Sequence, residues 1–94
     1  ITKGDQFQNV RRASDVATLL LEMGHTPYVP HMTCLWHMIH PQSYERWLSF
    51  DFEWISVCDA VLRMDGDSDG ADREVAFAKE CNIPVFYRIS DLCK

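Results

Sequence analysis

Apolar residues recur at three- and four-residue spacing in three stretches of the chain, and this period predicts three helices. Gly24 and Asn82 follow the first and third stretches, where a small or amide residue commonly ends a helix. Ser43 precedes the second stretch, and its hydroxyl can accept a hydrogen bond from a first-turn amide. The predicted helices cover residues 9–23, 44 to about 57, and 72–81.

Three shorter apolar runs alternate with these helices and predict strands. The predicted strands cover residues 26–30, 60–64 and 83–87. Pro27 and Pro30 limit the ladder bonds of the first run, which places it at an end or edge of the sheet. Alternation of helix and strand is typical of right-handed βαβ units, so we expect one α/β domain over residues 1–94 with a parallel sheet.

Ligands of such sheets bind at the carboxyl ends of the strands. Three connections are predicted at this edge of the sheet: residues 31–42, residues 65–71 and the turn after Tyr87. Residues 1–8 are mostly polar and contain Gly4, which predicts a loop, and no strand precedes the first predicted helix. We therefore expect the first strand of the domain to be missing from the sequence.

Length and composition narrow the class of protein. The 94 residues suffice for one domain, and a hydrophobic fraction of 47% argues against disorder. The net charge is −5 and Arg11-Arg12 is the only basic pair, which disfavours nucleic-acid binding. No apolar run is long enough to cross a membrane, and no signal peptide is visible. The cysteines form no C-x-x-C pair and fit a reducing, cytoplasmic setting: Cys34, Cys58, Cys81 and Cys93.

Residues 65–74 are the most informative segment, because they follow a predicted strand and open the third helix. Glu74 falls in the first turn of that predicted helix, where the dipole and the free amides favour an ionised carboxylate. An enzyme that transfers a glycosyl group by double displacement needs such a nucleophile. The alternative is that Glu74 only complements the helix dipole, as acids commonly do at this position.

Asp51 lies among aromatic residues in the second predicted helix. If it is buried near Glu74, desolvation and like charge raise its pKa, which suits a general acid/base for a leaving nucleobase. The alternative is an ordinary solvated acid. The aromatic residues Tyr44, Trp47 and Trp54 can stack on a base, although aromatics at helical spacing more often form core.

Two patterns resemble metal sites only in part. His31, Cys34, His37 and His40 recur every third residue, but structural zinc sites usually pair closely spaced ligands from two segments. The run that starts at Asp65 resembles a calcium loop but lacks the acidic twelfth position. Polar side chains that line a ligand site explain the histidines equally well, and neither a metal nor another cofactor is predicted.

Five segments carry a further pattern that spans nearly the whole chain. They are residues 24–31 (GHTPYVPH), Trp36-His37, residues 44–54 (YERWLSFDFEW), Cys58-Asp59-Ala60 and residues 68–74 (SDGADRE). This pattern resembles nucleoside 2-deoxyribosyltransferase-like proteins, in particular short members related to nucleoside 5′-monophosphate N-glycosidases. The resemblance implies a flavodoxin/Rossmann-like three-layer domain whose first strand ends in a Gly-Pro or Gly-Ser loop.

The resemblance also implies residue roles. Glu74 matches the family's nucleophile, and Asp51 matches the helix-borne acid that assists at the base or ribose. Ser68 occupies a position where relatives that hydrolyse nucleoside 5′-monophosphates tend to have Ser, and relatives that act on free nucleosides tend to have Asp. Ser68 therefore favours a 5′-phosphorylated substrate. The resemblance further implies a homo-oligomer that completes its sites across an interface.

These assignments predict cleavage or transfer at the N-glycosidic bond of a nucleoside or nucleoside 5′-monophosphate. Glu74 attacks C1′ and Asp51 manages the proton of the leaving base, with the two carboxylates about 5–6 Å apart as in retaining mechanisms. The predicted substrate-binding residues are Ser68, Gly70, Ala71, His31, Trp36 and His37. The alternative is a domain that binds and senses a nucleotide without turning it over.

Overall fold

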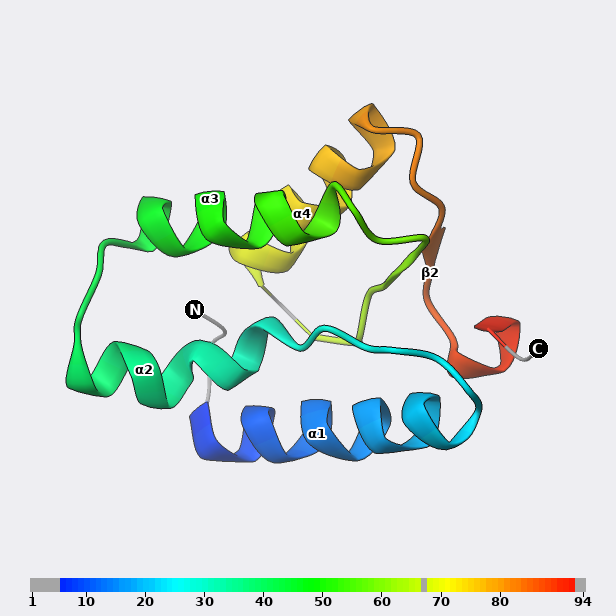
Figure 1. The fold of residues 1–94 in the computed structure, drawn as a ribbon, viewed down its shortest axis with the longest axis horizontal. Helices are drawn as coiled ribbons and strands as arrows, with labels where there is room; N and C mark the ends of the chain where they lie inside the picture. The colour runs from blue at the N-terminus through cyan, green and yellow to red at the C-terminus, as the bar shows by residue number, and fades with distance from the viewer. Residues whose placement is uncertain (1–5, 67, 93–94) are drawn as a thin grey trace.

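The computed structural model describes residues 6–66 and 68–92, whose arrangement is shown in Figure 1. Helices make up most of this part of the chain. The elements are α1 (Gln6–Glu22), η1 (Pro30–Met32), α2 (Thr33–Ile39), α3 (Tyr44–Ile55), β1 (Val61–Leu62), α4 (Asp69–Glu80), β2 (Val85–Phe86) and η2 (Ile89–Leu92), where η marks a 3-10 helix. In Figure 1, α2 and β2 lie at opposite ends of the molecule, and α1 runs along one side between those ends.

The three helices predicted from apolar spacing are confirmed as α1, α3 and α4. Ser43 caps α3, because its Oγ accepts a hydrogen bond from the amide of Arg46 at 3.1 Å. Gly24 follows α1 with φ of 94°, and Asn82 follows α4 with φ of 60°. Both residues hold the left-handed conformation that the sequence predicts for a helix end.

Residues 26–42 differ from the prediction. The strand expected over residues 26–30 does not form, and Pro30 starts η1 instead. Proline suits the first position of a helix, because the N–H that it lacks would have no partner within the helix there. Thr33 then donates from Oγ1 to the carbonyl oxygen of Pro30 at 2.9 Å, which joins η1 to the start of α2. The loop expected over residues 31–42 therefore contains one 3-10 turn and one helix.

The predicted flavodoxin/Rossmann-like three-layer α/β domain is wrong. The described residues are mostly helical, and the sheet among them has two strands, with Val61 paired to Val85 and Leu62 to Phe86. The parallel direction of these strands agrees with the prediction, but each pairs over two residues. Residues 26–30 supply no third strand, so within the described residues β1 has a ladder partner on one side only and the layers of a larger sheet do not form.

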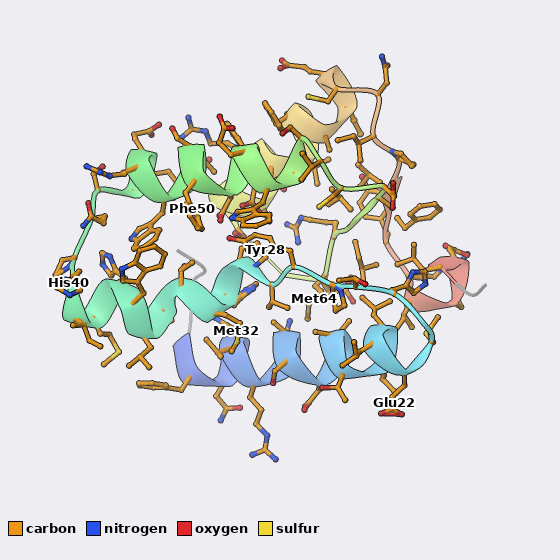
Figure 2. All side chains as sticks on the ribbon, in the orientation of Figure 1. Glu22, Tyr28, Met32, His40, Phe50 and Met64 are labelled. Atoms are coloured by element: carbon orange, nitrogen blue, oxygen red, sulfur yellow. The ribbon has the colours of Figure 1, made fainter. Side chains whose placement is uncertain are left out.

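The core between the helices is small, and its buried apolar residues, among those that the structure describes, are Ala13, Leu48, Ile55 and Ala78. Phe52 of α3 stacks on Phe77 of α4 with ring centroids 4.3 Å apart and ring planes 1° apart, which joins these two helices. Phe50, labelled in Figure 2, extends from α3 toward α2, where its ring meets Trp36 edge-on, and it also packs edge-on against Trp47 of α3. Aromatic contacts therefore hold α3 against both α4 and α2.

Several large apolar side chains of α2 lie at the surface. Leu35 is 66% exposed and Ile39 is 64% exposed. The homo-oligomer and the cytoplasmic location stay predictions. Among residues 6–66 and 68–92, none of the helices has the length and apolar character that crossing a bilayer requires.

Candidate functional site

A cavity of about 280 Å³ lies among α1, η1, α2, α3 and α4. Its lining residues are Asn9, Val10, Pro30, His31, Thr33, Cys34, His37, Gln42, Tyr44, Trp47, Leu48, Asp51, Ser68, Gly70, Ala71 and Glu74. All of the residues predicted for the site, except Trp36, are among them. Residues that are far apart in the sequence thus meet at one hollow, as the functional prediction requires.

Glu74 and Asp51 face each other across the contact between α4 and α3. Burial raises the pKa of Glu74 to about 8, and a hydrogen bond with Asp51 and the charge of Asp51 add to the rise. Tyr28 fixes Asp51 from the other side, because its hydroxyl donates to Asp51 Oδ1 at 3.0 Å. The rise favours the protonated form of Glu74, whose carboxyl can then donate to Asp51.

The protonation of Glu74 differs from the prediction. The sequence places Glu74 in the first turn of its helix, where the dipole favours the ionised form, but α4 begins at Asp69 after its cap Ser68. Glu74 therefore lies in the second turn, where the effect of the dipole is weak and burial decides the charge.

Tyr28 is the residue that bonds the Asp51 carboxylate. Its pKa is raised by burial and then by the charge of Asp51 and the hydrogen bond to it. The Tyr28 ring also stacks on Trp54 with centroids 5.3 Å apart, and Figure 2 shows Tyr28 beneath α3. Trp54, a candidate stacking partner for a base, therefore holds Tyr28 instead and is not among the lining residues.

The start of α4 forms one wall of the cavity. Ser68 Oγ accepts from the amide of Ala71 at 3.1 Å, so the Ser68 hydroxyl caps the helix and keeps its proton for a further bond. Gly70 permits close approach, because a Cβ at this position would lie 3.3 Å from Tyr44 Oη. The Tyr44 hydroxyl itself donates to Asp69 Oδ2 at 2.9 Å. Small residues therefore leave room at the end of the helix that a ligand would approach.

The two lining histidines are held in different ways. Burial lowers the pKa of His31, which favours its neutral form. His37 Nδ1 accepts from Trp47 Nε1 at 2.8 Å and from the Gln42 amide at 3.2 Å.

The prediction that Trp36 contacts the substrate is not supported by its position. Trp36 packs edge-on against Trp47 with centroids 5.0 Å apart, and it is 50% exposed.

Sequence reasoning did not select Tyr28, Thr33 or Gln42. Tyr28 belongs to the segment that carries the family resemblance, but its partner Asp51 is 23 residues away, so no local pattern indicates the bond. Thr33 and Gln42 lie within a stretch that was predicted to be a loop. Their contribution follows from α2, which the sequence pattern did not predict.

The described residues contain no group of three or more His, Cys, Asp or Glu side chains that could hold a metal ion. The zinc alternative needed the histidines and Cys34 to converge on one point. In the fold, His37 uses Nδ1 to bind Trp47 and Gln42 instead.

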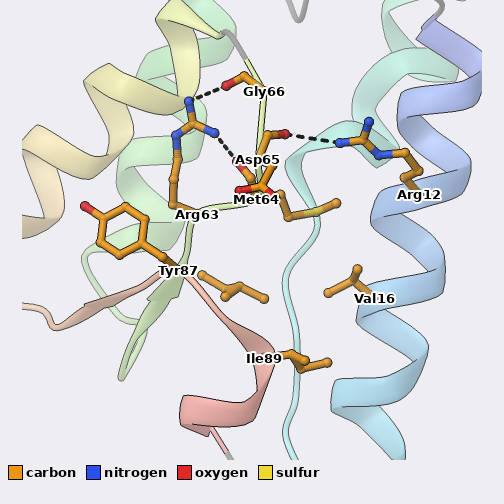
Figure 3. A pocket seen from close by; sticks show the side chains of 9 residues that line it. Arg12, Val16, Arg63, Met64, Asp65, Gly66, Tyr87 and Ile89 are labelled. Atoms are coloured by element: carbon orange, nitrogen blue, oxygen red, sulfur yellow. Dashed lines mark hydrogen bonds between the residues drawn. The ribbon is translucent and has the colours of Figure 1, made fainter.

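A second cavity, of about 480 Å³, lies between α1 and the two strands (Figure 3). Both of its arginines donate hydrogen bonds to backbone carbonyls of the loop after β1. Arg12 donates to the carbonyl oxygen of Asp65 at 3.1 Å, and Arg63 donates to the carbonyl oxygens of Met64 and of Gly66, the latter at 2.8 Å. Because these guanidinium groups bind the loop, and Arg63 also pairs with the exposed Asp72 carboxylate at 3.2 Å, we assign the candidate site to the smaller cavity.

Comparison with known proteins gives one match. The sequence model of a family described as a domain of unknown function (DUF7768) matches residues 2–88. No curated protein and no solved structure matches the chain.

Proposed function

We propose a function for this chain, which belongs to the DUF7768 family, from the chemistry of its cavity: it binds a nucleoside and cleaves or transfers the N-glycosidic bond. The observation that carries the proposal is that Glu74 and Asp51 meet in a hydrogen bond at the cavity wall, where burial favours the protonated form of Glu74. A retaining glycosyl transfer uses one carboxyl group as the nucleophile and another to move the proton. Tyr28, which donates to Asp51, fixes the orientation of the proton acceptor.

In the first step, a Glu74 oxygen forms a bond to C1′ of the sugar while the carboxyl proton of Glu74 passes to Asp51. The C1′–N bond breaks, and its electron pair moves to the base nitrogen. Asp51 gives the proton to that nitrogen and becomes a carboxylate again. The products are a sugar ester of Glu74 and a neutral base, so no net charge is created in the half-buried site.

In the second step, the Asp51 carboxylate accepts a proton from the group that attacks C1′. Water as the attacking group gives hydrolysis, and the N–H of a second base gives transfer. The C1′–Oε bond breaks, Glu74 leaves as a carboxylate, and Asp51 returns the proton to it. Direct contact between the two carboxyl groups lets this proton move without a bridging water.

The cavity favours an uncharged nucleoside over the 5′-monophosphate that Ser68 suggested. Asp51 contributes negative charge, and no Arg or Lys lies among the lining residues that the structure describes. A phosphate in this place would lack a counter-charge and would be repelled by Asp51. The volume of about 280 Å³ is at the small end of ligand sites, which span about 300–1,000 Å³ for drug-sized molecules.

The test is release of free base from a panel of nucleosides and 5′-monophosphates, followed by chromatography. We expect release from at least one nucleoside by the unmodified chain and a loss of at least about 10³-fold in Glu74→Ala, because the nucleophile is gone. Asp59→Asn is the matched control, since it removes an exposed carboxylate that does not line the cavity. Mass spectrometry of the peptide that contains Glu74 should detect the sugar ester.

The result that contradicts the proposal is base release that survives Glu74→Ala. A specific observation favours sensing as the second candidate function: burial raises the pKa of Glu74 and so favours its neutral carboxyl, which is a poor nucleophile. A sensor would gain thermal stability with a nucleoside or nucleotide and release no base. Both measurements on the same panel separate the two functions.

A further inference from the structure

The His37 ring is held in one tautomer by its hydrogen bonds. An indole N–H and a backbone amide can only donate, and both Trp47 Nε1 (2.8 Å) and the Gln42 amide (3.2 Å) donate to the same atom, His37 Nδ1. Nδ1 therefore carries no proton while these bonds are made. The proton of the neutral ring must be on Nε2.

The same bonds fix where the ring can turn. Trp47 belongs to α3, and Gln42 lies in the connection from α2 to α3, so two parts of the chain hold one edge of the imidazole. The Trp47 ring also packs edge-on against it, with centroids 6.0 Å apart and an interplanar angle of 72°. His37 lines the cavity and makes both bonds at Nδ1, which leaves the Nε2–H as the group that the ring can offer to a ligand.

We propose that His37 is a specificity-determining hydrogen-bond donor that selects a nucleobase with an acceptor, a ring nitrogen or carbonyl oxygen, at the edge that meets Nε2–H. The inference rests on the proposed function insofar as it takes the ligand to be a nucleoside. Bases are commonly recognised by hydrogen bonds to such edge atoms. A donor here also stabilises the negative charge that grows on the base as the C1′–N bond breaks.

Two substitutions separate this role from a structural one. His37→Asn keeps an amide oxygen near the place of Nδ1, which can accept from Trp47, but removes the donor at Nε2. His37→Gln places an amide N–H near the position of Nε2 but loses the acceptor for Trp47. A purely structural histidine tolerates Asn better than Gln, whereas a donor to the ligand tolerates Gln better than Asn.

The probes are the free bases adenine, hypoxanthine, cytosine and thymine, each with analogues in which one acceptor nitrogen is replaced by carbon or one carbonyl oxygen is removed. Binding is measured by titration calorimetry on the full chain, and folding is checked by thermal unfolding. We expect one base to bind about tenfold more tightly than its matching analogue, as one hydrogen bond warrants. His37→Asn should bind both equally, and His37→Gln should keep the preference.

The inference is overturned by a preference that persists in His37→Asn, by a loss of preference that is equal in both variants, or by failure of every base to bind at millimolar concentration. Binding of free bases requires no bond cleavage, so the outcome is distinct from the test of the proposed function. A base preference without nucleoside cleavage would keep the role of His37 and remove the glycosidic reaction. Nucleoside cleavage without any preference for the acceptor atom of the base would keep the glycosidic reaction and remove the role of His37.

Discussion

The two cavities of this molecule hold their charged groups in opposite ways. In the smaller cavity, Glu74 and Asp51 are partners of each other, so one proton can move between them. In the larger cavity, Arg12 and Arg63 donate to backbone carbonyls (Figure 3), and Arg63 also pairs with the exposed Asp72 carboxylate at 3.2 Å. Size therefore does not mark the reactive site. What distinguishes the candidate site is a partly buried carboxyl group in contact with a second carboxyl group.

The largest expected effect is that of pH on the free energy of unfolding, through the carboxyl group of Glu74. The folded pKa of Glu74 is about 8 against an ordinary value of 4.5, so the folded chain retains a proton that the unfolded chain releases. Stability should be full below pH 4.5 and should fall as pH rises through about 8. The expected loss in unfolding free energy is on the order of 3 kcal/mol, because a tenfold difference in proton affinity between the two states corresponds to about 1.4 kcal/mol and solvent contact reduces the total.

Urea unfolding at both ends of this pH window measures the loss. Glu74→Gln is the matched variant, because its amide stays neutral at every pH and the fall in stability should become much shallower. A slope that is the same in both proteins would show that Glu74 is not the group that titrates. Asp59→Asn, which changes an exposed acid, should leave the slope as it is.

The next effect is on the reaction. Above about pH 8 Glu74 loses the proton that the leaving base requires, so kcat/KM for base release should fall about tenfold for each further pH unit. The measurement is initial rate against pH with the best nucleoside of the panel. A rate that is level or rising through pH 8 would contradict the shared-proton mechanism, even if Glu74→Ala is inactive.

A smaller effect is expected in the larger cavity. Arg63→Met removes the bonds to the loop after β1, and we expect a loss of about 1 kcal/mol in unfolding free energy because loop carbonyls lose their donors. Arg12→Met is the comparison, with a loss below about 0.5 kcal/mol, since it removes one bond at an exposed position.

Arg63 also connects the two regions. Its positive charge lowers the pKa of Glu74, in opposition to the effect of burial. Arg63→Met should therefore move the alkaline fall in base release to higher pH without abolishing the reaction, and Arg12→Met should leave the profile in place. Loss of all base release in Arg63→Met, with folding intact, would mean that the larger cavity takes part in the chemistry directly.

The parts of the molecule that the sequence predicted correctly are those set by local period. The apolar stripes of α1, α3 and α4 recur with the helical repeat, and Ser43 and Gly24 have conformations that suit their chemistry. The meeting of Asp51 with Glu74 was also predicted, through family resemblance combined with positions on two helices. The other residues predicted for the site, except Trp36, line the same cavity as this pair.

The errors have physical causes that a local pattern does not reveal. Pro27 and Pro30 fit an edge strand or a turn equally well, and within residues 6–66 and 68–92 no strand pairs with this segment. The apolar run in residues 33–39 fits either a loop or a short helix that rests on α3. The charge of Glu74 depends on burial by segments that are distant in sequence, which outweighs the helix dipole that sequence position suggests.

The stacked rings of Phe52 and Phe77 lie beside the reactive pair in sequence, Phe52 directly after Asp51 and Phe77 three residues after Glu74. Two flat rings at van der Waals distance act as a fixed spacer between the backbones of α3 and α4. The distance between the Asp51 and Glu74 carboxyl groups should thus be set by this apolar ring contact and not by the ligand. If the cavity must widen to admit a nucleoside, we expect the movement on its other side, which is formed by α1, η1 and α2.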